Sequence, residues 1–207
     1  GVTFKANTDD MRDSSSLSMI PSLIKKGANF FSTDRRGSEL IKYAANAFLA
    51  TKISYINELA NLCEKINVNV EDVSLGIGLD QRIGSRFLRA GPAYGGSCFP
   101  KDTKAITSTG DEHKIDLSII KTVIKSNDKR QKLLAERIKK ILLNKVKNKV
   151  VTFLGVTFKP NTDDMRQSPC IYMIPYLLKL GAIIKYYEPT GEKKELSNHK
   201  KLSFHNN

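Results

Sequence analysis

The stretch from Ser38 to Ile66 contains no glycine or proline, and its apolar residues recur at intervals of three or four positions. That interval matches the turn of an α-helix, so the stretch predicts one long amphipathic helix over residues 38–66. The residues on its apolar face are Leu40, Ala44, Ala45, Phe48, Leu49, Ile53, Ile56, Leu59, Ala60 and Cys63. Most helices are stabilised by burying such a face against a partner, so the rest of the fold is expected to be arranged around it.

More helical segments are expected after the long one. The pattern predicts a short helix over residues 70–76, a glycine-bearing loop region over 80–98, and a second long helix from 117 to about 143. Asp116 stands directly before this last helix and is expected to cap its N-terminus. Most of the chain up to this point is therefore predicted to be helical.

A βαβ unit is predicted next. The β-branched run over residues 149–154 predicts one strand, and residues 183–187 predict a second. Between them, an apolar helix begins at Ser168 and Pro169, which suit its cap and first turn, and ends before Gly181. The expected fold class is α+β, with a long-helix domain followed by a Rossmann-like α/β unit.

The chain also contains an internal repeat, because residues 1–30 and 155–184 are identical at most of their positions. The two copies lie much farther apart than the period of a solenoid, which indicates a duplicated fragment. The later copy includes the helix of the βαβ unit and follows a predicted strand. The early copy predicts a helix over about 14–26, ended by Gly27, with no strand before it. We therefore expect residues 1–30 to be poorly anchored.

The net charge of +13 raises the question of a nucleic-acid partner. The lysines are scattered along predicted helices without interleaved aromatic residues, so solvated helix faces are the favoured interpretation and no nucleic-acid partner is expected. A basic cleft would equally suit a diphosphate substrate and a dinucleotide cofactor. The sequence has no apolar run of membrane-spanning length and no signal-peptide pattern, so no membrane partner is expected.

The cysteines Cys63, Cys98 and Cys170 are an odd number and lack the spacing of metal ligands. This usage favours a reducing compartment, so a cytoplasmic location and no metal site are expected. Cys63 lies on the apolar face of the 38–66 helix, and Cys170 follows a predicted helix start. Both are expected to be structural.

Cys98 differs from the other two because of its surroundings. It lies in the segment Gly95-Gly96-Ser97-Cys98-Phe99-Pro100-Lys101-Asp102. Pro100 suits the first position of a helix, which would place Cys98 at the open N-terminal end, where a thiolate is favoured. The two glycines would let another molecule approach the backbone closely. A buried cysteine in a tight turn is the alternative, and the neighbouring Lys101 and Asp102 weigh against it.

Four segments lie in order along the chain: Glu39–Ile53 (ELIKYAANAFLATKI), Gly76–Phe87 (GIGLDQRIGSRF), Gly95–Asp102 (GGSCFPKD) and Gly155–Arg166 (GVTFKPNTDDMR). Together they resemble the UDP-glucose/GDP-mannose dehydrogenase family, whose members are NAD-dependent enzymes that oxidise a sugar alcohol to a carboxylate. The first and third segments are most similar to the UDP-glucose branch. The resemblance covers residues from about 31 to 190, and the family's chain is considerably longer.

The resemblance implies a division of the chain into three parts. Residues 31–147 would be a helical central domain that forms dimers and carries the cysteine segment, and residues 148–207 a truncated UDP-binding α/β domain. Residues 1–30 would be a partial duplicate of 155–184. No GxGxxG sequence follows a predicted strand. The family's N-terminal NAD-binding domain is therefore expected to be absent.

The resemblance also implies catalytic roles. Cys98 is similar to the nucleophile that traps an aldehyde as a thiohemiacetal, which is then oxidised to a thioester and hydrolysed. Lys42 and Asn46 lie one helical turn apart and resemble the pair that stabilises the oxyanion, and Lys42 also contacts the substrate. Asp102 would orient or deprotonate water. The alternative for Asp102 is a helix-start carboxylate that serves only the helix dipole.

Other residues resemble binding positions of the family. The substrate, UDP-glucose, would be held by Phe87, Leu88, Arg89, Ala90, Gly91 and Gly95. Arg82 is similar to an arginine that reaches the substrate across a dimer interface, and Lys159 to a nucleotide-sugar contact. Lys101 and Arg166 are similar to contacts of the NAD cofactor. For each of these lysines and arginines, a solvated surface side chain is the alternative.

The resemblance thus implies NAD-dependent oxidation of UDP-glucose to UDP-glucuronate by a homodimer formed through the 38–66 helix. The alternative is a non-catalytic fragment or decayed paralogue that retains only the dimerising core. In a third interpretation, a separate chain supplies the missing cofactor domain. Hydride transfer needs a cofactor held within contact distance of the sugar, so these interpretations differ in whether the chain alone forms NADH.

Overall fold

The computed structural model of the chain describes residues 16–28, 34–196 and 199–206. The chain divides into two units, residues 1–39 and 40–207. In the first unit, helix α1 spans Ser16–Lys25 and is followed by Gly27, whose φ of 84° is left-handed. A left-handed glycine just after a helix is a common stop, as predicted here. The predicted poor anchoring of residues 1–30 concerns positions that lie largely outside the described ranges.

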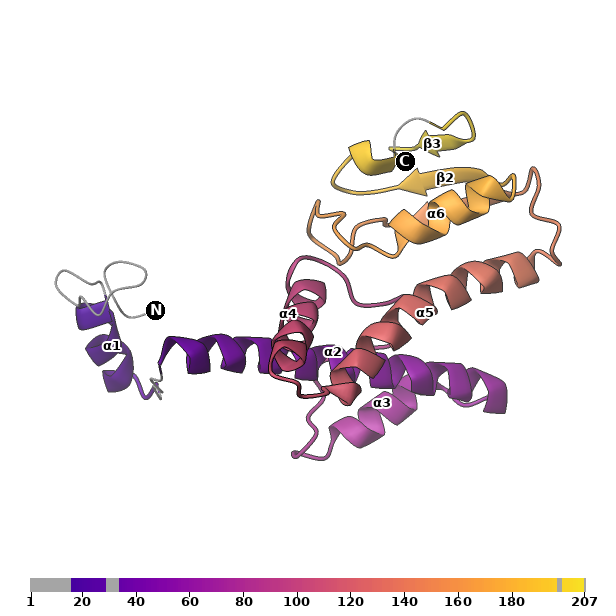
Figure 1. Cartoon of the computed structure of the whole chain (residues 1–207). Helices are drawn as coiled ribbons and strands as arrows, with labels where there is room; N and C mark the ends of the chain where they lie inside the picture. The colour runs from indigo at the N-terminus through magenta and orange to yellow at the C-terminus, as the bar shows by residue number, and fades with distance from the viewer. Residues whose placement is uncertain (1–15, 29–33, 197–198, 207) are drawn as a thin grey trace. The chain divides into compact units, whose positions relative to one another are not determined.

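Helix α2 spans Arg35–Ile66 and begins before the predicted first residue, Ser38 (Figure 1). Asp34 explains the earlier start. Its side chain accepts a hydrogen bond from the backbone N–H of Gly37 at 2.6 Å, and its carbonyl accepts one from Ser38. These contacts satisfy N–H groups that have no partner within the helix, so a glycine is tolerated in the first turn.

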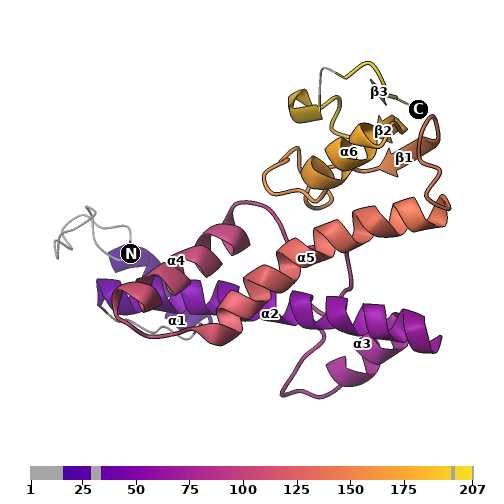
Figure 2. The same cartoon turned by 45° about the vertical axis from the view of Figure 1, so that its right-hand side comes forward.

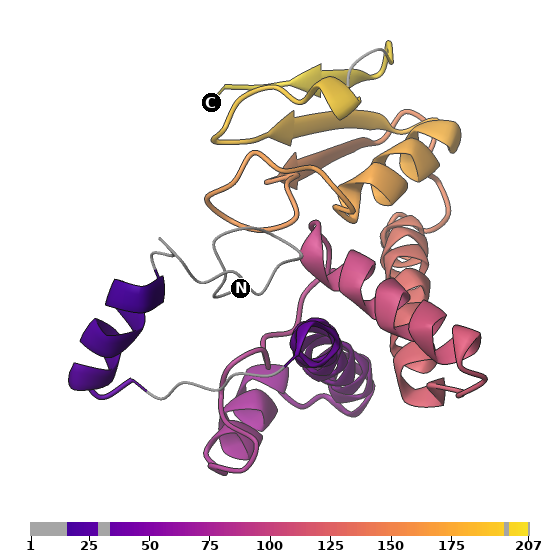
Figure 3. The same cartoon turned by 60° about the vertical axis from the view of Figure 1, so that its left-hand side comes forward.

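Three further helices complete the helical part of the chain. They are α3 (Val70–Gly78), α4 (Cys98–Glu112) and α5 (Ser118–Ile141). Asn69 caps α3 by accepting a hydrogen bond from the backbone N–H of Glu71 at 3.0 Å. Figure 3, which views α2 nearly end-on, shows α3 on one side of α2 and both α4 and α5 on the other.

The prediction that Asp116 caps α5 is wrong. Leu117 is the residue before this helix, and no side chain caps it. The Asp116 carboxylate instead accepts a hydrogen bond from Lys121 Nζ at 2.9 Å, and the same ammonium bonds to Asp111 at 2.6 Å. Asp116 therefore pairs with an exposed lysine and does not cap the helix.

The buried residues of α2 agree only in part with the predicted apolar face, to which Ile56 and Cys63 belong. Its buried residues are Ala47, Ala50, Ser54, Ile56, Asn57 and Cys63. Ala50 packs in a small cluster with Tyr94 and with Val123 of α5. By contrast, Leu40 is 53% exposed and Phe48 65% exposed. Small side chains let neighbouring segments approach closely, which explains why Ala47, Ala50 and Ser54 are buried as well, while Leu40 and Phe48 lie at the surface.

Within residues 40–207, the helices are followed by an α/β unit that begins at strand β1 (Val150–Leu154). It consists of β1, helix α6 (Cys170–Lys179), strand β2 (Ile183–Tyr187), a short 3-10 helix η1 (Lys194–Leu196) and strand β3 (Leu202–Phe204). The strands are parallel and lie in the order β1-β2-β3 (Figure 2). The predicted βαβ unit is confirmed. The third strand was not predicted, because three residues are too few for an alternating pattern to be recognised.

The core of the α/β unit lies between the sheet and α6. The residues buried there are Val146, Val156, Met165, Ile174, Leu177, Ala182, Ile184, Tyr186 and Leu196. Helices α5 and α6 contact each other, so this core continues toward the helical part. The expected α+β class, with a long-helix part followed by a parallel α/β unit, describes the structure.

Candidate active site

Cys98 is the first residue of α4, and its side chain is exposed. The prediction that Pro100 begins this helix is wrong, since Pro100 lies within the first turn, where its missing N–H has no helical partner to lose. Residues 95–98, here called the cysteine loop, lead the chain into the helix. Because the first N–H groups of a helix are unpaired, Cys98 lies where negative charge is favoured.

The glycines of the cysteine loop pack against the α/β unit. The backbone N–H of Gly96 donates to the carbonyl of Arg166 at 2.8 Å. A Cβ added at Gly95 would lie 2.3 Å from the carbonyl oxygen of Gln167, and one at Gly96 would lie 2.6 Å from the ring of Phe158. Both glycines are therefore required by close approach, and the later copy of the repeat forms one wall of the loop.

The carboxylate of Asp102 is completely buried and connects α4 to α2. One oxygen accepts a hydrogen bond from Asn46 Nδ2 at 2.5 Å, and the other lies 2.8 Å from Lys101 Nζ. Burial raises the pKa of Asp102, but the contacts with Lys101 and Asn46, helped by the charge of Lys42, outweigh it and hold the pKa below its ordinary value. Asp102 is thus an ionised carboxylate that fixes both neighbours.

Positive charge gathers around Cys98. The contact with Asp102 raises the pKa of Lys101, and the charge of a thiolate at Cys98 raises it further. The hydrogen bond from Arg166 to Asp164 raises the pKa of Arg166, and a Cys98 thiolate again adds to this. Two cations from different parts of the fold therefore lie within electrostatic reach of the sulfur.

The structure brings together Cys98, Lys42, Asn46 and Asp102, and with them Lys101, for which the resemblance implied a cofactor contact. Here the group Lys42, Asn46, Cys98, Lys101 and Asp102 is called the cysteine cluster. Its members come from α2 and from the start of α4, which are separated by the whole of α3 and the following loop. The cluster combines a thiol, two ammonium groups, an amide and a carboxylate.

The backbone of residues 87–91 is fixed by side chains from two helices. Gly91 N–H donates to Asn57 Oδ1 at 2.8 Å, and Gly91 C=O accepts from Arg130 Nε at 2.7 Å. Arg130 also donates to the carbonyl of Asn57 at 2.9 Å. Asn57 and Arg130 were not predicted as site residues. Nothing in the local sequence around either one indicates that both bind the distant Gly91.

The side chains of this segment differ in exposure. Leu88 is 2% exposed, and Phe87 is 41% exposed with its ring edge-on to Phe99 at a centroid distance of 6.0 Å. Arg89 is exposed, and Ala90 is partly buried. Since Phe99 directly follows Cys98, the aromatic contact connects the segment to the cysteine loop.

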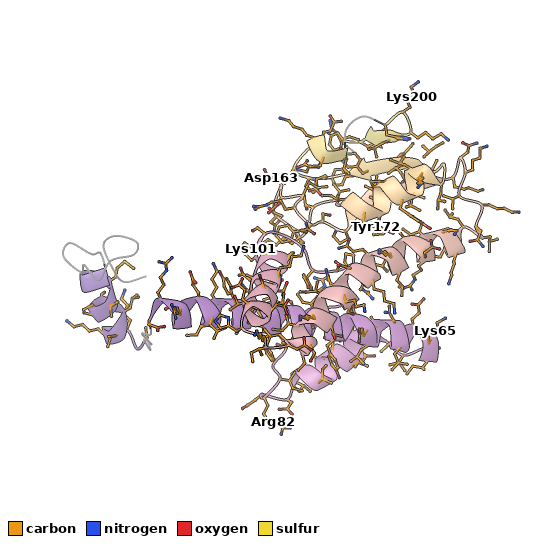
Figure 4. All side chains as sticks on the ribbon, in the orientation of Figure 1. Lys65, Arg82, Lys101, Asp163, Tyr172 and Lys200 are labelled. Atoms are coloured by element: carbon orange, nitrogen blue, oxygen red, sulfur yellow. The ribbon has the colours of Figure 1, made fainter. Side chains whose placement is uncertain are left out.

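Two predicted site residues are held elsewhere. Arg82 is exposed and forms an ion pair with Asp80 at 2.6 Å, two residues away. Figure 4 shows Arg82 on the opposite side of α2 from Lys101, so this chain alone does not bring Arg82 to the cysteine cluster. The Lys159 ammonium lies over the ring of Phe158, 5.2 Å from its centroid. Lys159 is therefore next to the wall of the cysteine loop, although no contact with the cluster is formed.

The other cysteines are structural, as expected. Cys63 is 5% exposed, and burial raises the pKa of Cys170 to about 11. Among the described residues, no group of three or more His, Cys, Asp or Glu side chains is arranged to hold a metal ion. Within the same ranges, no helix combines the length and the hydropathy needed to cross a membrane.

The chain matches two domains of one protein family. Residues 36–129 match the central domain of the UDP-glucose/GDP-mannose dehydrogenase family, and residues 152–207 match its UDP-binding domain. A UDP-glucose 6-dehydrogenase of Rickettsia felis is 50% identical over 185 residues, which are 89% of this chain and 40% of that protein. The enzyme of the same name from Rhizobium meliloti is 51% identical over 159 residues, or 77% of this chain and 36% of that protein.

A solved structure supports the same family assignment. The UDP-glucose dehydrogenase from the archaeon Pyrobaculum islandicum superposes with a TM-score of 0.82 at 32% sequence identity, covering 93% of this chain and 45% of that one. The chain thus spans less than half the length of each of these relatives. The matched domains, the sequence identity and the shared fold lead to one conclusion, that the chain belongs to the UDP-glucose/GDP-mannose dehydrogenase family.

Proposed function

We propose that this chain carries the sugar-binding and covalent part of a UDP-glucose 6-dehydrogenase, with Cys98 as its nucleophile. The observation that carries the proposal is the buried Asp102, which contacts Asn46 of α2 and Lys101 of α4 beside Cys98. An inert thiol at the surface has no need of this arrangement. UDP-glucose is the proposed substrate because the relatives named above carry that sugar nucleotide in their names.

In the covalent step, the thiolate sulfur of Cys98 attacks the carbonyl carbon of a C6 aldehyde. A sulfur–carbon bond forms, and the π electrons of the C=O bond move to the oxygen, so the negative charge passes from sulfur to oxygen. The ammonium of Lys42 and the amide of Asn46 would stabilise that oxyanion. Asn46 already donates one amide N–H to Asp102, which fixes the amide and leaves its second N–H for the substrate.

For Asp102 we propose a positioning role rather than that of a general base. Its pKa is held below the ordinary value by Lys101 and Asn46, and a carboxylate with a low pKa is a weak proton acceptor. Residues 87–91 and 95 would hold the sugar nucleotide through the backbone, with Lys159 as a further contact. Arg82 is proposed as a contact supplied by the second subunit of a dimer.

The cofactor of this reaction would be NAD, but the described residues do not fit it as a complete site. In the βαβ unit β1–α6–β2, the residues after the first strand are Gly155-Val156-Thr157-Phe158, without the glycine pattern that lets a pyrophosphate approach. Lys101 and Arg166 are proposed only as contacts at the edge of the cofactor. The hydride acceptor would have to be held mainly by other residues. A cytoplasmic location stays a prediction.

The proposal is tested by incubating the chain with UDP-glucose and NAD and following NADH. In parallel, alkylation of Cys98 by iodoacetamide is followed by mass spectrometry with and without UDP-glucose. Cys98→Ala is the test variant, and Cys170→Ser is the matched control, because the early copy of the repeat has serine at the equivalent position. We expect saturable protection of Cys98 by UDP-glucose in the wild type and in the control.

NADH that is formed by the wild type and lost in Cys98→Ala would extend the proposal to full activity of the chain. Protection without NADH would support the substrate site and the alternative of a non-catalytic chain. Absence of any protection, in protein shown to be folded by circular dichroism, would contradict the proposed function.

A second proposal concerns self-association through α2. Four apolar residues at heptad spacing, Ile41, Phe48, Tyr55 and Leu62, are 51%, 65%, 53% and 53% exposed. Such a stripe on a long helix is the pattern by which two helices pack together. We infer that two copies of the chain meet along it and form the homodimer.

The stripe is tested by sedimentation of the wild type and of Phe48→Glu. We expect a dimer that becomes monomeric in the variant, because a carboxylate would be buried at the interface without a partner. Ile119→Glu, at an apolar position of α5 that is 72% exposed, is the control for the added charge. A dimer that persists in Phe48→Glu would rule this interface out.

A further inference from the structure

A polar cavity of about 230 Å³ lies between α2 and α5, apart from the cysteine cluster. Ser54, Asn61, Lys129 and Arg130 are among the residues that line it. The space between two packed helices is usually filled by apolar side chains, so a polar cavity there needs an explanation.

The first sign that the cavity binds a ligand is an unpaired hydroxyl. Ser54 is 6% exposed, and its Oγ has no hydrogen-bond partner among the described residues. A buried hydroxyl without a partner costs free energy, so such groups are normally paired. The Ser54 hydroxyl is therefore available to a molecule that enters the cavity.

The second sign is a half-buried charge without a counter-ion. Arg130 donates to the carbonyls of Gly91 and Asn57 and to Asn61 Oδ1, all of which are neutral. No carboxylate among the described residues lies within ion-pair distance of this guanidinium. Burial lowers the pKa of Arg130, and the charge of Arg137 lowers it further, whereas the charge of Glu64 partly opposes them. A half-buried cation without an ion-pair partner favours a bound anion.

The residues around the cavity also carry a net positive charge. A wider cleft of about 730 Å³ shares Asn61 and Lys129 with it and adds Lys65, Lys132 and Lys140. Figure 4 shows Lys65 near the C-terminal end of α2, which is one side of this cleft.

The linings of the cavity and the cleft together hold six cationic side chains (Lys65, Lys129, Arg130, Lys132, Arg137 and Lys140) and three carboxylates, so their net charge is positive. Glu58 accepts a hydrogen bond from Ser126 at 2.6 Å, Glu64 forms an ion pair with Arg137, and Glu136 accepts one from Tyr176. The remaining positive charge would attract anions toward the cavity.

We propose that the cavity between α2 and α5 is a binding site for a phosphate-bearing anion, held by the Arg130 guanidinium, the Ser54 hydroxyl and the Lys129 ammonium. A guanidinium with a hydroxyl and an ammonium is a donor set that suits phosphate oxygens. Because Arg130 also holds the carbonyl of Gly91, an anion there would stiffen residues 87–91. The binding site does not depend on the proposed function.

The proposal is tested with the full chain by isothermal titration calorimetry with inorganic phosphate, against sodium chloride of equal ionic strength. We expect saturable binding in the wild type and roughly tenfold weaker binding in Ser54→Ala, which removes one hydrogen bond to a charged group. Ser54→Ala is expected to fold, since it removes only an unpaired hydroxyl.

Asn61→Asp is the sharper variant. It keeps the oxygen that accepts from Arg130 but adds a negative charge beside the guanidinium, so phosphate binding should be lost while the fold is retained. Lys42→Gln is the control for the cysteine cluster and should bind phosphate as the wild type does. Loss of binding in Lys42→Gln would assign the phosphate to the cysteine cluster and overturn the proposal.

Two further results would also overturn it. One is the absence of any heat from phosphate beyond that of chloride. The other is unchanged binding in Asn61→Asp. Binding of duplex DNA with a steep salt dependence, without binding of free phosphate, would assign the charge to nucleic acid and count against a small-anion site.

Discussion

Helices α1 and α6 carry closely similar residues in different surroundings. In α6, Met173 and Leu177 are 8% and 0% exposed, and Leu177 packs in the core of the α/β unit. Their counterparts in α1, Met19 and Leu23, are 57% and 39% exposed. The repeated sequence is thus sufficient to specify a helix, whereas the burial of its apolar residues depends on the strands on either side of α6.

The copies differ in sequence where α6 faces α5. The Tyr176 hydroxyl donates to Glu136 of α5, and the ring of Tyr172 stacks on that of Tyr176 with centroids 6.1 Å apart. The corresponding residues of the early copy are Ser18 and Ser22. The residues that face the sheet are thus shared, and the contact with the neighbouring helix belongs to the later copy.

The largest expected difference comes from the matched pair Leu177→Ala and Leu23→Ala. Truncating the fully buried Leu177 should lower the free energy of unfolding by about 2–5 kcal/mol, because a cavity is left behind. Truncating the exposed Leu23 should change it by less than about 0.5 kcal/mol. Urea unfolding followed by circular dichroism measures both. Equal losses would show that α1 is packed as tightly as α6.

A smaller effect is expected where the later copy touches the cysteine loop. Gly96→Ala would place a Cβ 2.6 Å from the ring of Phe158 at a φ of 78°, and should cost about 2–3 kcal/mol. Gly27→Ala is the control, because its φ is also left-handed and no atom lies within 4 Å of its Cβ. It should cost only the backbone strain, about 1 kcal/mol. Calorimetric melting of both variants measures the difference, and similar losses would contradict the close packing.

Acid should weaken the anchoring of the later copy. Glu188 is 5% exposed and accepts hydrogen bonds from the backbone N–H groups of Val156 at 2.8 Å and Thr157 at 3.3 Å. Burial raises the pKa of Glu188, but these hydrogen bonds and those from Thr190 outweigh it, so the pKa lies below the ordinary 4.5.

Since the folded-state pKa is the lower one, the stabilisation is fully present above pH 4.5 and is lost as the pH falls through the folded-state value. Glu188→Gln should be less stable at neutral pH by roughly 1–2 kcal/mol, and its stability should fall less steeply with acid. Urea midpoints of both proteins from neutral pH down to about pH 3 test this. Parallel curves would show that Glu188 does not carry the acid sensitivity.

The smallest expected effect concerns the contact with α5. Tyr176→Phe removes the hydroxyl that donates to Glu136 and should lower the free energy of unfolding by about 0.5–1 kcal/mol, because the acceptor is partly exposed to water. Glu136→Gln provides the second arm of a double-mutant cycle. Additive losses from the two changes would mean that the hydrogen bond contributes nothing of its own.

Local patterns predicted the elements of this fold well. The periodicity of residues 38–66 and the β-branched run at 149–154 gave α2 and β1 to within a few residues. Such signals work because they depend only on neighbours along the chain. The same signals identified Ile56 and Cys63 as buried but not Ala50, whose burial comes from packing against Tyr94 and Val123. They also missed β3, which pairs with β2 in a register that its own residues do not encode.

The candidate site was predictable in part for the same reason. Lys42 and Asn46 share a helix face by spacing alone, and the cysteine segment is recognisable as it stands. The contact of Asn46 with Asp102 crosses 56 positions of the chain, and the bonds of Arg130 to Gly91 and Asn57 cross 39 and 73. Contacts at such distances follow from the tertiary fold, so the sequence pattern held no sign of them.

The three thiols of the chain can report the order in which its parts unfold, because they differ in exposure. Cys98 is exposed, Cys170 lies partly buried at the start of α6, and Cys63 is buried on α2. An alkylating reagent will therefore modify Cys98 at once, Cys170 when the α/β unit opens, and Cys63 when α2 separates from its neighbours. The order of modification, read peptide by peptide, gives the sequence in which this molecule comes apart.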